Sequence, residues 1–361
     1  MKTVILTFHS AYNFGASLQA WALQTKLEEL GVDAYMINYR PNIIDDLYNP
    51  MAHKRGIAKT RLYRKWYNSD QMLRYDNYEG FIKNQFHLMG EAYNYKELME
   101  QRFDLDACIV GSDQVWNVEH TGGDDAYFLD FLNSGIRKIS YAASIGSDYI
   151  MPENVKMFEK GLASFDAISV REKTAKGLLT DYTDKNIDVV LDPTLLLDVK
   201  QYDRIKKPVE YKEKYIIVYM MERNKELISL ARYMSRLMGL PIVQRRQNVI
   251  FKNELKPMYT YTAGEFLSCI EQAEFVLTNS FHGTVFSILY GKPFISMLHS
   301  DTGSRTIDLL STLGLESHLM YKLNKEKCIQ TLQFDNQDEV YQKIVEQRKN
   351  SINFLKNALQ I

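Results

Sequence analysis

The first forty residues alternate between strand and helix patterns, and this alternation limits the folds open to the chain. Residues 2–8 form a short apolar, β-prone run, and a polar turn over residues 9–15 follows it. An apolar stripe then predicts a helix over about 16–30, which Gly31 ends, and a second strand is predicted over 32–38. A strand, a helix and a strand in this order form a βαβ unit, which requires a parallel sheet. We therefore predict an α/β fold.

The strand pattern recurs along the rest of the chain. Further short runs with strand character lie at 107–110, 139–143, 167–170, 188–191, 215–220, 241–243, 275–278 and 294–297. A polar, charged stretch over 198–214 is typical of a linker, and 361 residues suit two cores better than one. We predict a first parallel-sheet domain over 1–200 with a helical insertion at about 41–100. We also predict a second parallel-sheet domain over 212–335 and a final helix over 336–361 that could pack back on the first domain.

Composition argues against several classes of protein. The chain has 44 basic and 45 acidic residues, and this balance gives no electrostatic case for nucleic acid as a partner. No run approaches the roughly 18–20 apolar residues of a membrane-spanning helix, and the start of the chain lacks the features of a signal peptide. Three scattered cysteines suggest neither a disulfide framework nor a metal site, so we expect a cytoplasmic protein. The basic run 54–65 indicates a solvated helix face or, at most, peripheral contact with an anionic membrane.

One motif in the second half of the chain carries the clearest chemical signal. Residues 275–284 combine a buried strand, a polar turn and a helix start, with Asn279 and Ser280 as candidate caps. The amides that open the helix, from Thr284 onward, point toward the same place as His282. A helix N-terminus beside an imidazole can hold an anion and move a proton, and Gly283 would let the backbone approach a ligand. The alternative is a core histidine in an ordinary strand-to-helix turn.

Two arginines could complete an anion site. Arg171 follows a predicted strand, where a guanidinium suits bidentate binding of a carboxylate or phosphate, or a salt bridge to a neighbour such as Glu172. Arg305 follows the loop after another strand and would supply a second cation, unless it is a solvated side chain in the first turn of a helix. Ligands of open α/β sheets bind outside the carboxyl ends of the strands. We therefore expect these turns to converge on one cleft between the two domains.

A third turn, over residues 111–117, offers hydrogen-bond donors, acceptors and a flat ring, a mixture that suits sugar hydroxyls. Asp113 is the candidate base on the side of the acceptor, and Ser112, Trp116 and Asn117 are candidate contacts of the sugar. The alternative is a plain turn in which Trp116 is packed in the core.

The first turn of the chain is a candidate phosphate cradle. Asn13, Gly15 and Ser17 open a helix whose backbone amides could hold a phosphate. The pattern lacks the three glycines of the dinucleotide motif, which argues against a nicotinamide cofactor. The histidines show no metal-ligand spacing. We expect neither a cofactor nor a metal.

Taken together, these motifs resemble the polysaccharide pyruvyl transferase family. The matching pieces occur in the family's order across about residues 4–315, at 10–15, 110–117, 141–146, 169–173, 191–194 and 278–283. Each piece is short, and the ordered set carries the resemblance. One departure is that many members have an acidic residue after the glycine of the first loop, where this chain has Ala16 and Ser17.

The resemblance implies two Rossmann-like domains facing a cleft, as in the GT-B glycosyltransferases. It also implies transfer of the enolpyruvyl unit of phosphoenolpyruvate onto two hydroxyls of a sugar, which could be lipid-linked or nucleotide-linked, to form a cyclic ketal. By the resemblance, His282 and Arg171 contact phosphoenolpyruvate, and Arg305 corresponds to a further cation. His282 would act as an acid or phosphate ligand, the two arginines as anion clamps and Asp113 as a base.

Two other functions stay open at this point. The first is a glycosyltransferase of the same architecture that uses a nucleotide sugar, although the two glutamates eight positions apart that many retaining enzymes carry are absent. The second is a non-catalytic protein that binds sugars or anions on the same scaffold. The sequence does not indicate an oligomeric state.

Overall fold

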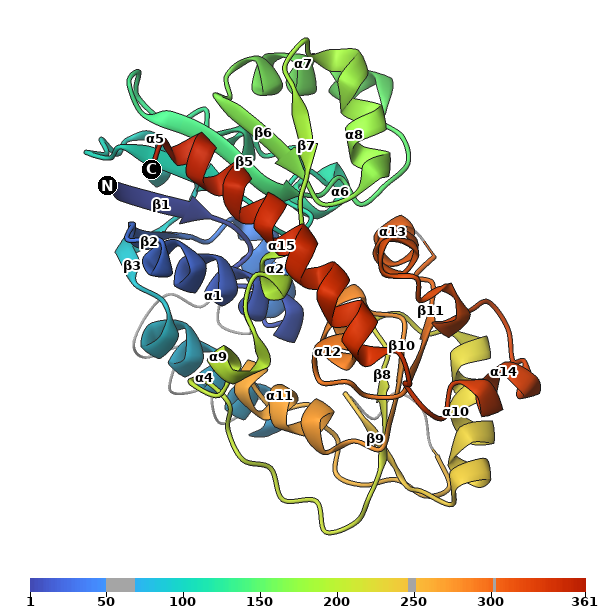
Figure 1. The fold of residues 1–361 in the computed structure, drawn as a ribbon. Helices are drawn as coiled ribbons and strands as arrows, with labels where there is room; N and C mark the ends of the chain where they lie inside the picture. The colour runs from blue at the N-terminus through green and yellow to red at the C-terminus, as the bar shows by residue number, and fades with distance from the viewer. Residues whose placement is uncertain (50–68, 246–250, 301–302) are drawn as a thin grey trace. The chain divides into compact units, whose positions relative to one another are not determined.

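The chain folds into two units, each built around one parallel sheet (Figure 1). The computed structural model describes residues 1–49, 69–245, 251–300 and 303–361. Unit 1 comprises Met1–Leu197 and Gln347–Ile361, and unit 2 comprises Asp198–Glu346. Both are α/β, as predicted.

Unit 1 has a sheet of seven strands in the order β3-β2-β1-β4-β5-β6-β7, with every neighbouring pair parallel. The strands are β1 (Lys2–Leu6), β2 (Asp33–Tyr39), β3 (Leu88–Tyr93), β4 (Ala107–Val110), β5 (Arg137–Ala143), β6 (Ala167–Val170) and β7 (Ile187–Val189). The strand order reverses between β1 and β4, and the polar turns that follow these two strands lie at this switch point, where open α/β sheets bind ligands.

The helices of unit 1 lie mainly in the crossovers between its strands. They are α1 (Phe14–Glu29), α2 (Asn42–Tyr48), α4 (Ser69–Gln85), α5 (Tyr95–Met99), α6 (Val118–Thr121), α7 (Val155–Ala163) and α8 (Lys173–Leu179), with short 3-10 turns η1 (Asp125–Phe128), η2 (Pro152–Asn154), η3 (Thr180–Tyr182) and η4 (Pro193–Leu195). Helix α1 begins two residues earlier than predicted because the Asn13 side chain caps it and accepts a hydrogen bond from the amide of Gly15 at 2.9 Å.

The segment predicted as a helical insertion at about 41–100 is not wholly helical. Besides α2, α4 and α5 it contains β3, which pairs with β2 at the edge of the sheet. No residue of β3 is fully buried. Its sequence therefore lacks the continuous apolar run that is typical of a strand covered on both faces. The basic run 54–65 lies outside the described residues.

Unit 2 has a parallel sheet of five strands in the order β12-β11-β10-β8-β9. Its strands are β8 (Ile216–Tyr219), β9 (Ile242–Gln244), β10 (Phe275–Thr278), β11 (Phe294–Met297) and β12 (Leu319–Met320). Its helices are α9 (Val199–Tyr202), α10 (Lys225–Met238), α11 (Ala263–Gln272), α12 (Phe281–Leu289), α13 (Ser304–Leu313) and α14 (Lys325–Gln330), with the 3-10 turn η5 (Glu316–His318). Every residue of the central strands β8 and β10 is buried, which is typical of a sheet covered by helices on both faces.

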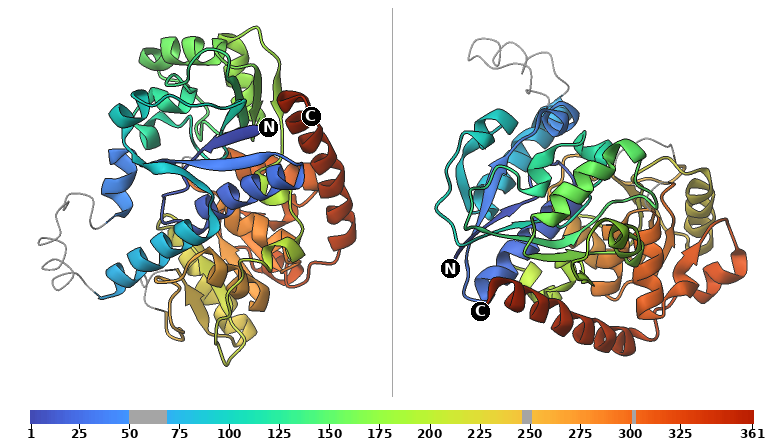
Figure 2. Two further views of the ribbon diagram at one scale, coloured as in Figure 1. Left: turned by 90° about the vertical axis from the view of Figure 1, so that its left-hand side faces the viewer. Right: turned by 90° about the horizontal axis from the view of Figure 1, so that it is seen from above.

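Helix α15 (Gln337–Leu359) belongs to both units and is one continuous helix in every view (Figure 1 and Figure 2). Its last turns bind unit 1. Arg348 Nε donates to the carbonyl of Leu195 at 2.8 Å, and Ser351 Oγ accepts from the amide of Leu191 at 2.9 Å. The helix therefore supports the segment that follows β7. Within the described ranges, none of the helices combines the length and the apolar character needed to cross a membrane.

Candidate functional site

The turn after β10 places His282 at the start of α12. Ser280 is the N-cap of this helix, as predicted, and its hydroxyl accepts from the amide of Gly283 at 3.3 Å. The helix begins at Phe281, so His282 lies in its first turn rather than before it. The imidazole is 7% exposed and lies where the partial positive charge of the helix N-terminus is strongest.

Arg305 lies close to the same turn. Its guanidinium carbon is 5.7 Å from the centre of the Phe281 ring, and that ring meets the imidazole of His282 edge to face at 5.2 Å. Arg305 is buried in the first turn of α13, which contradicts the alternative of a solvated side chain. Unit 2 therefore brings an imidazole and a guanidinium into contact with one aromatic ring, at the N-termini of α12 and α13. Phe281 was not among the predicted site residues.

Gly283 and Thr284 have structural roles in this turn. A Cβ on Gly283 would lie 2.4 Å from Thr278 Oγ1 and 2.9 Å from Tyr219 Cδ1, so the glycine lets α12 approach β10 and β8 rather than a ligand. Thr284 is fully buried, and its hydroxyl bonds the carbonyl of Ser280 at 3.1 Å. Both residues therefore have packing roles, and their predicted contact with a substrate stays a prediction.

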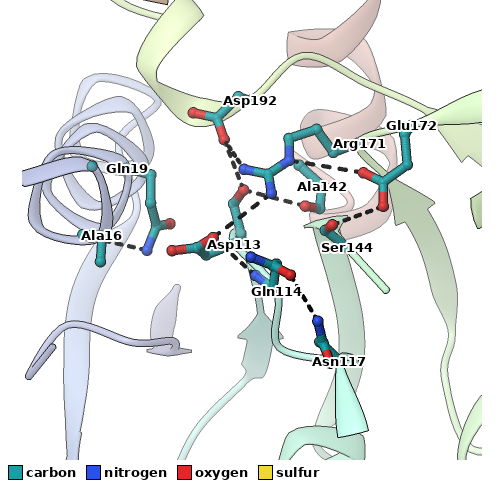
Figure 3. Close-up of polar contacts among 12 residues, drawn as sticks. Ala16, Gln19, Asp113, Gln114, Asn117, Ala142, Ser144, Arg171, Glu172 and Asp192 are labelled. Atoms are coloured by element: carbon teal, nitrogen blue, oxygen red, sulfur yellow. Dashed lines mark hydrogen bonds and ion pairs between the residues drawn. The ribbon is translucent and has the colours of Figure 1, made fainter. Parts of the chain in front are cut away.

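In unit 1, Arg171 lies at the end of β6 and is surrounded by three carboxylates (Figure 3). Its Nη1 is 2.7 Å from Asp192 Oδ2, its Nη2 is 3.7 Å from Asp113 Oδ1, and its Nε is 3.8 Å from Glu172 Oε2. Burial by itself would lower the pKa of Arg171, but the carboxylates, Asp192 first, raise it above its ordinary value. The side chain is 2% exposed and makes the salt bridges of the alternative interpretation, and the anion clamp at Arg171 stays a prediction.

Two of these carboxylates tie several strand ends together. Asp192 accepts from Thr194 Oγ1 at 2.6 Å and from Ser112 Oγ at 3.1 Å, which connects the segment after β7 to the turn after β4. Glu172 accepts from Ser144 Oγ at 2.7 Å, which connects the ends of β6 and β5. Ser112 is fully buried in this network, and its contact with a sugar stays a prediction. Asp192 and Glu172 were missed, although each lies within a few residues of a strand end.

Asp113 is the third carboxylate and the most exposed of the three. Its side chain is 15% exposed, against 0% for Asp192 and 2% for Glu172. Its backbone adopts the left-handed conformation with φ of 69°, which aspartate tolerates better than most residues, and its Oδ1 accepts from the amide of Gln114 at 3.0 Å. The role of Asp113 as a general base stays a prediction.

Trp116 and Asn117 do not face a ligand. The Trp116 ring is 1% exposed, stacks on Phe128 at 5.7 Å between centroids, and donates its Nε1 proton to the carbonyl of Tyr127 at 3.0 Å. Asn117 is buried, and its side chain caps α6 by accepting from the amide of Glu119 at 3.0 Å. The Trp116 ring is therefore packed in the core, as the packed-turn alternative has it.

The first loop lies against the turn that carries Asp113. Gln19 Nε2 donates to Thr7 Oγ1 at 2.9 Å, and that hydroxyl donates to the carbonyl of Ser112 at 3.0 Å. Ser17 is fully buried, and its hydroxyl forms no hydrogen bond with any residue that the structure describes. Asn13 and Gly15 form the helix cap already described, so the phosphate cradle at this loop stays a prediction.

No metal centre is formed by the described part of the chain, which contains no group of three or more His, Cys, Asp or Glu arranged to hold an ion.

Comparisons with known proteins bear on this arrangement. A family model described as polysaccharide pyruvyl transferase matches residues 13–301. Among curated proteins, no sequence matches the chain. Solved structures similar in fold include a UDP-N-acetylglucosamine 2-epimerase (TM-score 0.53, 13% identity, 99% of this chain and 94% of that one). Another is the UDP-GlcNAc 2-epimerase of Methanocaldococcus jannaschii (TM-score 0.52, 14% identity, 96% of this chain and 99% of that one). A third is S. aureus MnaA with UDP (TM-score 0.51, 12% identity, 100% of this chain and 97% of that one). These neighbours have the GT-B fold, which confirms the expected fold class.

Proposed function

Because the chain belongs to the polysaccharide pyruvyl transferase family, we propose that it transfers the enolpyruvyl unit of phosphoenolpyruvate to a sugar and forms a pyruvate ketal. The observation that carries this proposal is the family match over residues 13–301, which includes the larger part of both units. The family membership makes the chain a transferase that acts in polysaccharide modification.

The donor site that we propose lies in unit 2. Phosphoenolpyruvate carries a carboxylate and a phosphate, so its site needs fixed positive charge. Arg305 supplies that charge together with the N-terminus of α12, where His282 lies, and burial strengthens each electrostatic contact. We assign Arg305 as the anion ligand and His282 as the acid.

The chemistry requires one acid and one base. His282 donates a proton to the methylene carbon of phosphoenolpyruvate, and the first sugar hydroxyl attacks the adjacent carbon while Asp113 takes the proton of that hydroxyl. The second hydroxyl then displaces phosphate from the same carbon, and its proton leaves with the phosphate. The products are the ketal and inorganic phosphate.

The direct test is release of phosphate from phosphoenolpyruvate in the presence of lipid-linked and nucleotide-linked sugars, with mass spectrometry of the sugar product. Nucleotide-linked acceptors belong in the screen because the S. aureus structure holds UDP. We expect His282→Ala to lower kcat by about 100-fold or more, the usual scale for an acid–base residue. Absence of phosphate release and of a ketal product with every acceptor would contradict the proposal.

His318 offers a matched control in the same unit. It is as buried as His282, but its Nδ1 bonds the carbonyl of Phe294 at 2.9 Å and its ring stacks on Phe294, so it has a structural role. We expect His318→Ala to lower thermal stability and to leave kcat within a few-fold of the wild-type value. Equal losses of kcat in both variants would remove His282 from the mechanism.

A nucleotide-sugar glycosyltransferase of the same fold is the alternative, and calorimetry distinguishes the two. Heat of binding with nucleotide sugars and none with phosphoenolpyruvate would favour the alternative. We also propose a cytoplasmic location, which is supported by the three cysteines, all of them buried free thiols.

A further inference from the structure

We propose that Gln114 binds the acceptor sugar beside Asp113, and that its side-chain nitrogen donates a hydrogen bond to the hydroxyl whose proton Asp113 takes. This inference rests on the proposed function, because it adds a contact with the acceptor to that reaction. Gln114 was not among the predicted site residues. It lies in the turn that follows β4 and is half-buried, so part of its side chain is open to a ligand.

The first argument is the orientation of the Gln114 amide. Asn117 Oδ1 accepts from the backbone amide of Glu119 at 3.0 Å, and because a backbone amide only donates, the other end of the Asn117 side chain is its nitrogen. That nitrogen, Nδ2, donates to Gln114 Oε1 at 2.8 Å. The oxygen of Gln114 is therefore turned toward Asn117, and Nε2 is the end that can bind a ligand. Within the described part of the chain, no residue accepts a hydrogen bond from this nitrogen.

The second argument is the fit of a neighbouring turn around this pair of amides. Gly146 follows β5 and has φ of 73°, and a Cβ there would lie 2.1 Å from Gln114 Oε1 and 2.8 Å from Asn117 Nδ2. The backbone of that turn therefore lies directly against the two side chains, and only glycine leaves room for them. The turns after β4 and β5 together hold the Gln114 amide in one orientation.

The third argument is what Gln114 and Asp113 offer together. Figure 3 shows the nitrogen end of the Gln114 side chain turned toward Asp113, and the backbone amide of Gln114 donates to Asp113 Oδ1 at 3.0 Å. An ionised carboxylate only accepts hydrogen bonds, whereas Nε2 only donates them. A sugar hydroxyl does both, so it can direct its proton to Asp113 and accept from Gln114 at the same time. The pair therefore orients the O–H bond of the acceptor toward the base.

The test is a graded series at position 114, measured with the lipid-linked or nucleotide-linked sugar that gives the ketal product with the wild type. Gln114→Met removes the donor without adding a charge, and we expect kcat/KM for the sugar to fall about 3- to 10-fold, the value of one neutral hydrogen bond. Gln114→Glu keeps an acceptor for Asn117 and replaces only the donor. One hydroxyl proton cannot serve two carboxylates, so this variant should lose more than Gln114→Met. In both, KM for phosphoenolpyruvate should stay within about twofold.

Asn117→Asp tests the orientation of the amide. The new carboxylate still accepts from the amide of Glu119, but its second oxygen repels Gln114 Oε1, so the Gln114 amide turns over and presents its oxygen to the acceptor. We expect kcat/KM for the sugar to fall in this variant as well. The matched control is Gln101→Glu, which adds the same charge after α5, where Nε2 donates to the carbonyl of Glu97 at 3.1 Å. This control should keep both kinetic constants within about twofold of the wild type.

The outcomes distinguish this inference from the proposed function. Unchanged kcat/KM for the sugar in both variants of Gln114 would overturn the inference. A higher KM for phosphoenolpyruvate with the sugar unaffected would also overturn it, because the amide would then belong to the donor. Either result leaves the ketal-forming activity of the wild type intact. A wild-type protein that neither binds nor consumes phosphoenolpyruvate would instead overturn the proposed function, and this inference with it, and no variant is needed to see that result.

Discussion

His9 should make the stability of unit 1 depend on pH. It follows β1 and is fully buried, and its ring nitrogens lie 3.3 Å from the carbonyl of Thr7 and 3.3 Å from Asn38 Oδ1. Burial lowers the pKa of His9 from 6.5 to about 4, and the positive charge of Arg40 adds to this effect. The two hydrogen bonds and the more distant Glu79 oppose the lowering without cancelling it.

The sign and size of the effect follow from that difference in pKa. The unfolded chain protonates His9 near pH 6.5, whereas the folded unit resists protonation down to about pH 4, so the unfolded state binds more protons between these values. Stability is therefore fully present above pH 6.5 and is lost as the pH falls toward 4. At about 1.36 kcal/mol per unit of pKa, the full loss is roughly 3 kcal/mol, and about 2 kcal/mol of it falls between pH 7 and 5.

The assay is urea denaturation at pH 7, 6 and 5, followed for the wild type and for His9→Gln, which has no titrating group at this position. The buried His318, whose pKa is also lowered by burial, is present in both proteins and cancels in the comparison. We expect the unfolding free energy of unit 1 to fall by about 2 kcal/mol more in the wild type than in the variant over this range. An equal loss in both proteins would refute the reasoning.

Three further substitutions test the packing around the site. Gly283→Ala places a methyl group against Thr278 and Tyr219 and should cost about 1–3 kcal/mol in urea denaturation. Trp116→Ala should cost about 3–5 kcal/mol and leave KM for the acceptor unchanged, because the ring is buried in the core; a weakened acceptor at normal stability would contradict this. Ser351→Ala leaves the amide of Leu191 without its acceptor and should cost about 1–3 kcal/mol in the same assay.

The sequence allowed a good prediction of the parallel architecture because its central strands are short and wholly apolar. Strands β4 and β10 are buried along their entire length, so their composition alone distinguishes them from the surrounding helices and turns. Strand β3 could not be found in this way, because at the edge of the sheet none of its residues is fully buried. Its pairing with β2 is decided by tertiary contacts.

The sequence indicated where the turn at His282 begins its helix, but it did not indicate which residues surround Arg171. The turn at Ser280 and His282 could be read from local capping signals, which act over a few residues. The surroundings of Arg171 could not, because its closest carboxylate, Asp192, lies 21 positions further along the chain. An arginine after a strand looks the same in sequence whether it faces a ligand or a buried carboxylate. Trp116 shows the same limit, since its partner Phe128 belongs to a separate turn.

Helix α15 is the last element to be synthesised, yet it supports a segment of unit 1 that is made much earlier. Arg348 and Ser351 hold the backbone of Leu195 and Leu191, on either side of Asp192. The ribosome finishes residues 191–197 and then makes the whole of unit 2 before either of these supports exists. Unit 1 is therefore complete only after the last residues of the chain have been made, although most of it is synthesised first.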